Sequence, residues 1–211
     1  MKLRGLLGLV AIVATAFFAG HVGTSSATSL CLVQLPECGL GNALPVPETV
    51  KAEMTNPFAV FAGQDECEIA KLELKTTSNT GPVKPLLAEV NPLKFLTCGS
   101  CPTVTARNLP YEAEFEALKD LPGPTWHGNG SLKIIDPKIE LSGCTPGNFT
   151  CIDSASSITL KVTGGSPMVI TASSAPLSVS GPTSCGSSSS FSAEYKVTSQ
   201  KKGTLWLEPD P

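Results

Sequence analysis

Apolar and polar side chains alternate along short segments between residues 48 and 208. In residues 158–163, isoleucine, leucine and valine are separated by threonine and lysine, and residues 191–198 repeat the pattern. The same alternation occupies residues 50–54 and 72–75. A period of two predicts β-strands that place one face on a core and the other in water.

Turn-forming residues separate these segments. Glycine, proline, serine and asparagine gather in residues 79–82 and 163–167, and the serine-rich residues 184–190 are also expected to form a loop. Short strands at this spacing predict an all-β fold, an antiparallel sandwich or a barrel-like structure. The pattern also permits a division near residues 97–101 into lobes 48–97 and 102–208.

Residues 111–118 satisfy two patterns. Tyr111, Phe115 and Leu118 have helical spacing, and alanine, glutamate and leucine favour helix. However, apolar side chains also alternate with three glutamates along this segment. We predict a strand, with the glutamates on a solvated face.

The first 27 residues have the three parts of a secretory signal peptide. Lys2 and Arg4 precede an uncharged apolar stretch, and small residues lead up to Ala27. The apolar stretch is about 16 residues long, which is short of the roughly 20 needed to span a bilayer, so a cleaved helix is favoured over a membrane anchor. We predict cleavage after Ala27, leaving an extension over residues 28–47, with Cys31 and Cys38, and an all-β domain over 48–208.

Charge narrows the range of partners. The whole chain has a formal net charge of −3, and loss of Lys2 and Arg4 makes the mature chain more acidic. An acidic chain without a basic cluster is unsuited to nucleic acid. No segment after the leader is apolar and long enough to span a membrane.

Eight cysteines follow the leader, and disulfides are the default state of an even set in an exported protein. A turn-rich loop separates Cys144 from Cys151, which suggests a local bridge, and Cys31 and Cys38 are close enough in sequence for another. The remaining four would form two long-range bridges. The disulfide candidates are Cys31, Cys38, Cys67, Cys98, Cys101, Cys144, Cys151 and Cys185.

Cys98 and Cys101 form the one motif with a named chemistry, because C-x-x-C occurs in thiol–disulfide oxidoreductases. There it lies at a helix N-terminus, whereas here residues 102–106 resemble a strand. A structural zinc site would need a second close pair of ligands, and Cys144 and Cys151 are seven residues apart. Structural disulfides are therefore expected, with an oxidoreductase as an alternative and no metal site.

No catalytic constellation is evident. His21 is lost with the leader, which leaves His127 as the only histidine, in a turn-like segment without a nucleophile motif. A secreted hydrolase that uses two carboxylates is a second alternative. The available carboxylates, none distinguished by its neighbours, are Asp65, Glu66, Glu68, Asp136, Glu140 and Asp153. We predict no catalytic residue and no cofactor.

The order of several segments resembles a group of uncharacterised secreted proteins of actinobacterial soil bacteria. The matching segments are Asp65-Glu66-Cys67, Leu96-Thr97-Cys98, residues 101–111, Leu141-Ser142-Gly143-Cys144, residues 159–167 and residues 191–198. Tyr111 stands where that group commonly has tryptophan, and Cys31 and Cys38 look like additions to the group's six cysteines. The resemblance implies a bacterial, exported all-β domain and brings no activity.

These patterns together predict a secreted or cell-envelope protein that acts by structure or binding rather than by catalysis. Its ligand or partner would lie outside the cell or at the cell surface.

Overall fold

The computed structural model describes residues 28–32, 43–55, 58–78, 85–117, 128–199 and 205–209. The predicted signal peptide, Cys38 and His127 lie outside these residues. The described backbone is built from strands, with one 3₁₀ turn, η2 (Thr183–Cys185). The strands are β1 (Thr28–Cys31), β2 (Thr49–Met54), β3 (Ala59–Phe61), β4 (Asp65–Ser78), β5 (Leu86–Cys98), β6 (Thr103–Ala106), β7 (Tyr111–Ala117), β8 (Asn129–Ile135), β9 (Lys138–Cys144), β10 (Phe149–Ser154), β11 (Ser157–Thr163), β12 (Met168–Ser180), β13 (Ser188–Ser199) and β14 (Trp206–Pro209).

The predicted all-β, antiparallel, barrel-like fold is confirmed, as is the strand at residues 111–117. Its alternation is visible in the burial, since Tyr111, Ala113 and Phe115 are buried while Glu112 is exposed.

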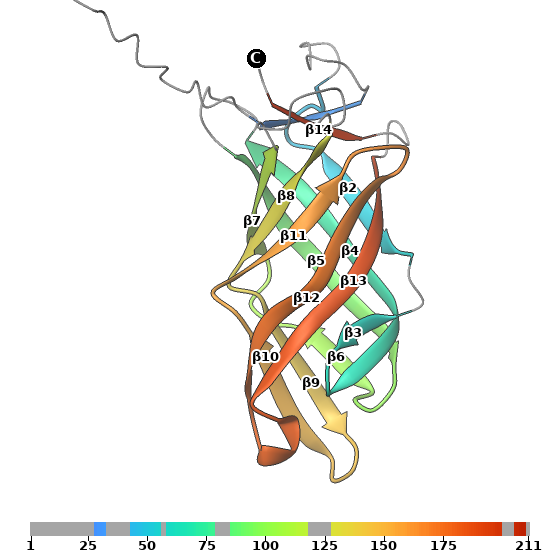
Figure 1. Ribbon diagram of the computed structural model, residues 1–211, viewed down its shortest axis with the longest axis vertical. Helices are drawn as coiled ribbons and strands as arrows, with labels where there is room; N and C mark the ends of the chain where they lie inside the picture. Colours follow the sequence, from blue (N-terminus) through green and yellow to red (C-terminus); the bar gives the residue numbers. More distant parts are fainter. Residues whose placement is uncertain are drawn as a thin grey trace, which may run out of the picture.

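Four long strands, β4, β5, β12 and β13, run most of the length of the molecule (Figure 1). Each has 12 to 14 residues, whereas the other strands have 3 to 7. The short strands fill the spaces between the long ones, one set toward each end. The molecule is therefore a long closed sheet in two tiers.

Each tier is a closed ring of eight antiparallel strands. In the upper tier the order is β4, β5, β7, β8, β11, β12, β13 and β2, which pairs with β4 again. In the lower tier it is β4, β5, β6, β9, β10, β12, β13 and β3, which also returns to β4. The rings share only the four long strands.

Irregularities mark the places where two of the long strands change partners. Strand β5 pairs with β7 through Val90 and with β6 at Lys94, and Pro92, which has no N–H to donate, lies between them. Strand β12 has a bulge between Ala172 and Ala175, beyond the last residue that pairs with β11.

Strands from both sides of residues 97–101, where the sequence permitted a division into two lobes, belong to one sheet. Strand β5 ends at Cys98 and pairs with strands on both sides of that point in the chain, namely β4, β6 and β7. The two proposed lobes are thus parts of one sheet.

Inward-pointing side chains fill the interior. Phe61, Phe95 and Phe191 meet in the lower tier, with ring centroids 5.2 to 6.2 Å apart. Beside them is an apolar cavity of only about 30 Å³, which is far below the several hundred Å³ of typical ligand pockets. The centre of the molecule is therefore a packed core.

A two-stranded sheet of β1 and β14 covers the upper end (Figure 1). Leu30 and Leu207 from this cover are buried against the core, as is Leu205 just before β14. Gly130 allows the close approach, because a Cβ there would lie 2.2 Å from the Glu116 carbonyl oxygen and 2.3 Å from Leu207 Cδ2. This end is closed by packing.

Tyr111 links β7 to β9 at the junction of the tiers. Its hydroxyl donates to the Lys138 carbonyl at 2.6 Å and accepts from the Lys138 N–H at 3.2 Å. Burial raises the pKa of Tyr111, and its backbone hydrogen bonds lower it in part. The hydroxyl satisfies backbone groups near a point where the strands diverge.

We expect Tyr111→Phe to lower the free energy of unfolding by about 1–3 kcal/mol, because the Lys138 N–H loses its partner. Urea unfolding measures this. Tyr195→Phe is the matched control, since the buried Tyr195 hydroxyl has no hydrogen-bond partner among the described residues. Equal losses in the two variants would contradict the assigned role.

Candidate functional site

Three disulfides brace the lower end of the molecule, where β4, β6 and β10 begin and β5 and β9 end (Figure 1). The bonded pairs are Cys67–Cys98, Cys101–Cys144 and Cys151–Cys185. Cys31 is also disulfide-bonded, and Cys38 lies outside the described residues. Covalent links thus join β4 to β5, the loop before β6 to β9, and β10 to η2.

The predicted local bridge between Cys144 and Cys151 is wrong. The hairpin register places Phe149 opposite Cys144 and Leu141 opposite Cys151, so the two cysteines do not face each other. Both are buried, and each bonds to a residue outside the hairpin.

Cys98 and Cys101 are bonded to different partners, Cys67 and Cys144, and not to each other. A dithiol centre of the C-x-x-C type needs these two sulfurs as a pair. Among the described residues no cysteine is free. The pairing therefore gives the oxidoreductase alternative no support.

Asp65 anchors the loop between Cys98 and Cys101. Its Oδ1 accepts from the backbone N–H of Ser100 at 2.7 Å and of Glu66 at 2.9 Å, and its Oδ2 accepts from Cys101 N–H at 3.1 Å. Asp65 also lies close to the sulfurs of Cys67 and Cys98. Those sulfurs form a disulfide, so they offer no thiolate to a metal ion.

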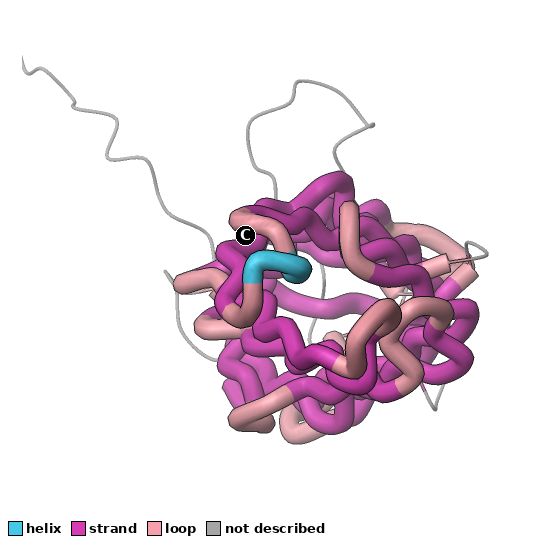
Figure 2. Tube along the Cα trace, turned by 90° about the horizontal axis from the view of Figure 1, so that it is seen from below, coloured by secondary structure: helices cyan, strands magenta, loops and turns pink. Residues whose placement is uncertain are grey.

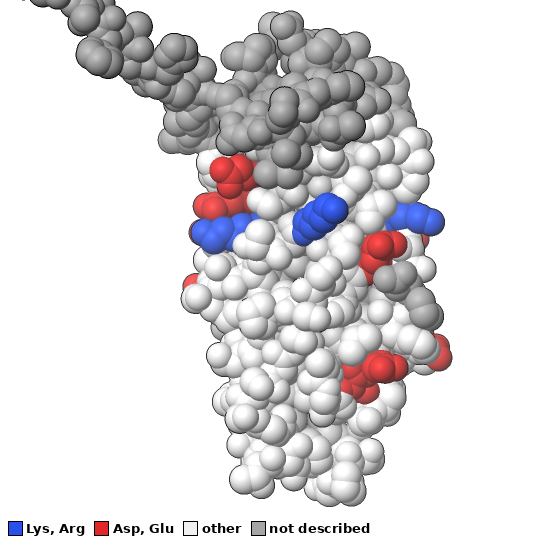
Figure 3. Space-filling view, viewed as in Figure 1, with Lys and Arg blue, Asp and Glu red and all other residues white. Residues whose placement is uncertain are grey.

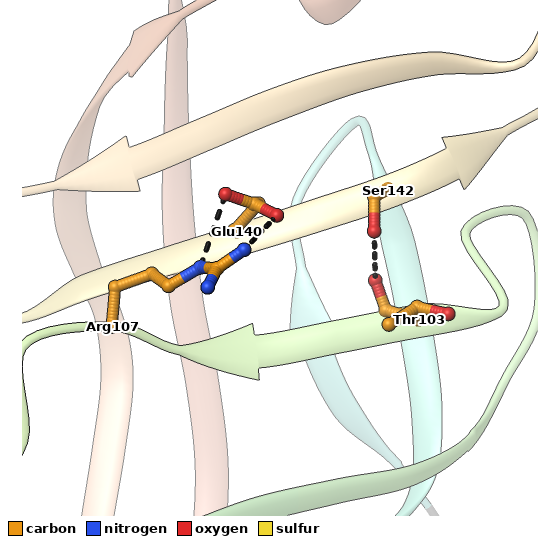
Figure 4. Close-up of polar contacts among 4 residues, drawn as sticks. All are labelled: Thr103, Arg107, Glu140 and Ser142. Atoms are coloured by element: carbon orange, nitrogen blue, oxygen red, sulfur yellow. Dashed lines mark hydrogen bonds and ion pairs between the residues drawn. The ribbon is translucent and has the colours of Figure 1, made fainter.

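Another candidate carboxylate, Glu140, forms a bidentate ion pair with Arg107 on the outer surface (Figure 4). The hydrogen bond and charge of Glu140 raise the pKa of Arg107. Nearby, Ser142 Oγ donates to the Thr103 carbonyl at 3.4 Å (Figure 4). These contacts tie β9 to β6 and leave Glu140 occupied by a structural partner.

The loops at the lower end surround a pocket of about 300 Å³. Figure 2 views the molecule from this end, with the strands and η2 arranged around the central axis. The lining comes from four separate parts of the chain: Gly63, Gln64, Ser100, Cys101, Cys144, Thr145, Pro146, Phe149, Cys151 and Ser184. Three of these residues are disulfide-bonded cysteines.

A second pocket, of about 350 Å³, adjoins the first and shares Gly63, Gln64 and Ser100 with it. Asp65 and Glu66 also line it. Asp65 is committed to three backbone N–H groups and Glu66 is exposed. This pair does not have the arrangement of a free acid and a free base that hydrolysis requires.

Behind Gln64 lies a cluster of polar groups inside the lower tier. Asp153 points inward from β10 and is 0% exposed, and neither carboxylate oxygen has a hydrogen-bond partner among the described residues. Gln64 Oε1 and Ser189 Oγ are also buried and without a partner. We define Gln64, Asp153 and Ser189 as the buried oxygen cluster.

Burial raises the pKa of Asp153, and the neighbouring Gln64 and Ser189 side chains offset part of that rise. Neither neighbour donates to the carboxylate with normal hydrogen-bond geometry. Gln64 is held in place by its Nε2, which donates to the Cys185 carbonyl at 3.2 Å. A buried carboxylate without hydrogen bonds is unfavourable, so Asp153 is a specific and unusual feature of this end.

Asp153 was among the carboxylates available in the sequence but was not distinguished from the others, and Gln64 and Ser189 were not predicted. One pattern was available, since alternation along β10 places Asp153 on the same inward face as Cys151. The prediction of a loop through residue 190 was wrong. Strand β13 begins at Ser188, and its alternation directs Ser189 inward.

No protein-family model, no curated protein and no solved structure matches this chain.

We expect Asp153→Asn to stabilise the protein near neutral pH, by about 1–3 kcal/mol, because asparagine removes an unpaired buried charge. The folded-state pKa is raised, so wild-type stability is lost as pH rises through that pKa. The gain should therefore be absent below the ordinary aspartate pKa of about 4 and grow above it.

Urea unfolding of both proteins between acid and neutral pH, in a chelating buffer, measures this difference. A constant difference across that range would contradict the proposed effect of burial.

Proposed function

We propose that the protein is a secreted or cell-envelope binding protein that takes up a small ligand at its disulfide-braced lower end. The observation that carries this proposal is the pocket of about 300 Å³ among loops joined by disulfides. This volume is at the lower limit of typical small-molecule pockets. The tight core argues against a site in the interior, and the β1–β14 cover argues against a site at the upper end.

Covalent bracing supports binding because a site that is already ordered loses little conformational entropy when it captures a ligand. The loops extend beyond the ends of the paired strands, so strand pairing does not hold them together. The disulfides Cys101–Cys144 and Cys151–Cys185 do so. The loops at residues 62–64, 99–102, 145–148 and 181–187 contain no charged residue. In the face that Figure 3 presents, the lower tip likewise shows no charged side chain.

Export of the chain rests on the leader over residues 1–27, and the disulfides fit an oxidising compartment. The resemblance to exported actinobacterial proteins supports the same location. Among the described residues, no helix is long and apolar enough to cross a membrane. Cleavage after Ala27 would leave β1, which begins at Thr28, whole.

Expression of the full chain in an exporting bacterial host should release a protein whose first residue is Thr28, within a few residues. N-terminal sequencing and intact-mass measurement of the culture fluid and cell fractions check this. Recovery of the uncleaved chain in the cytoplasm with reduced cysteines would contradict export.

Ser184→Trp tests the pocket, because Ser184 is exposed and lines it, so a tryptophan there would fill the space from the rim. We expect fragments that bind the wild-type protein in a ligand-observed NMR screen to lose binding at least tenfold in this variant. Ser187→Trp, in the same loop but outside the lining, should keep it. A screen without hits, or hits that survive Ser184→Trp, would contradict this location.

A further inference from the structure

In the buried oxygen cluster, every buried side-chain atom that lacks a hydrogen-bond partner is an oxygen. They are Asp153 Oδ1 and Oδ2, Gln64 Oε1 and Ser189 Oγ. They come from three parts of the chain, the turn after β3, strand β10 and strand β13. Native proteins satisfy nearly all such buried groups, so this many on three neighbouring residues indicates a missing electropositive partner.

Among the described residues, no side chain supplies that partner. The loops at the lower end contain no lysine, arginine or histidine. Burial raises the pKa of Asp153, and the groups that lower it, Gln64 and Ser189, are both uncharged. Among the described residues, the negative charge of Asp153 is therefore unbalanced.

The occupant must also be small. Each of the four oxygens is buried with almost no surface open to water, so an organic ammonium group would have to displace packed atoms. A bare metal ion has no hydrogen atoms or side groups to accommodate, so it needs less space than an organic cation. Carboxylate, amide and hydroxyl oxygens are the ligands preferred by hard cations such as Ca²⁺.

We propose that Gln64, Asp153 and Ser189 form a binding site for a hard inorganic cation inside the lower tier, behind the pocket. The orientation of Gln64 fits this role, since its Nε2 is engaged by the Cys185 carbonyl and its Oε1 is left for the ion. Through Gln64, the ion would join the turn after β3 to strands β10 and β13. The proposal does not depend on the pocket binding a ligand.

The test measures thermal unfolding of the mature, disulfide-bonded protein after chelation and dialysis. CaCl₂, MgCl₂, NaCl and KCl are then titrated separately at constant ionic strength. We expect one of them to raise the Tm saturably, by about 5–10 °C at a hundredfold excess over its Kd. Equilibrium dialysis with elemental analysis should find one ion per chain.

Asp153→Asn and Ser189→Ala should each reduce affinity for that ion at least tenfold. Glu116→Gln is the matched control, because it removes one negative charge from an exposed position on β7, a strand of the upper ring alone, and should keep the wild-type response. Asp153→Asn is expected to fold, since it keeps the shape of the side chain.

The proposal would be overturned if no cation raised the Tm of the wild type more than that of Asp153→Asn, or if dialysis found no bound ion. A more stable Asp153→Asn without any cation effect would show instead that a proton neutralises Asp153. Loss of pocket binding in Ser184→Trp with the ion effect intact would separate this site from the proposed function.

Discussion

Closure of the sheet on itself is the constraint on which the rest of the structure depends. Open sheet edges expose unpaired backbone groups that invite aggregation, and closure removes them. Here β4, β5, β12 and β13 belong to both rings, so each tier can close only if these four strands stay continuous and in register. The pairing changes at Pro92 and at the β12 bulge allow one strand to serve two sets of neighbours.

The two ends follow from this closure in different ways. The upper end is covered by β1 and β14, whose leucines complete the core. The lower end lacks such a cover among the described residues, and disulfides take over the bracing. Covalent bonds leave room for a pocket where a packed cover would fill it. The lower end thus combines a disulfide-braced rim, a pocket and a buried carboxylate.

Alternation was sufficient to predict several strands, among them β2, β7, β11 and β13, because burial of every second side chain is a local property of the sequence. It identified β7 and the inward positions of Phe191 and Tyr195 correctly. It did not reveal that the pattern before and after residue 100 forms one sheet, because partner choice depends on contacts far apart in the chain. Nor did it extend β13 back to Ser188, since serines obscure the contrast between the two faces.

Disulfide pairing and the buried oxygen cluster were beyond sequence reasoning for the same reason. Cys144 and Cys151 are neighbours along the chain, but the register of β9 and β10 turns them toward different partners. Asp153, Gln64 and Ser189 are far apart in sequence and meet only when the lower ring closes. The disulfide pairing and the buried oxygen cluster are consequences of the strand topology, which neither an isolated motif nor the composition predicts.

The central claim is that disulfides brace one end of a closed two-tier sheet. Peptide mapping of the mature protein under non-reducing conditions tests it most directly. The account predicts cross-linked peptides that join Cys67 to Cys98, Cys101 to Cys144 and Cys151 to Cys185. Bridges between Cys98 and Cys101, or between Cys144 and Cys151, would contradict it.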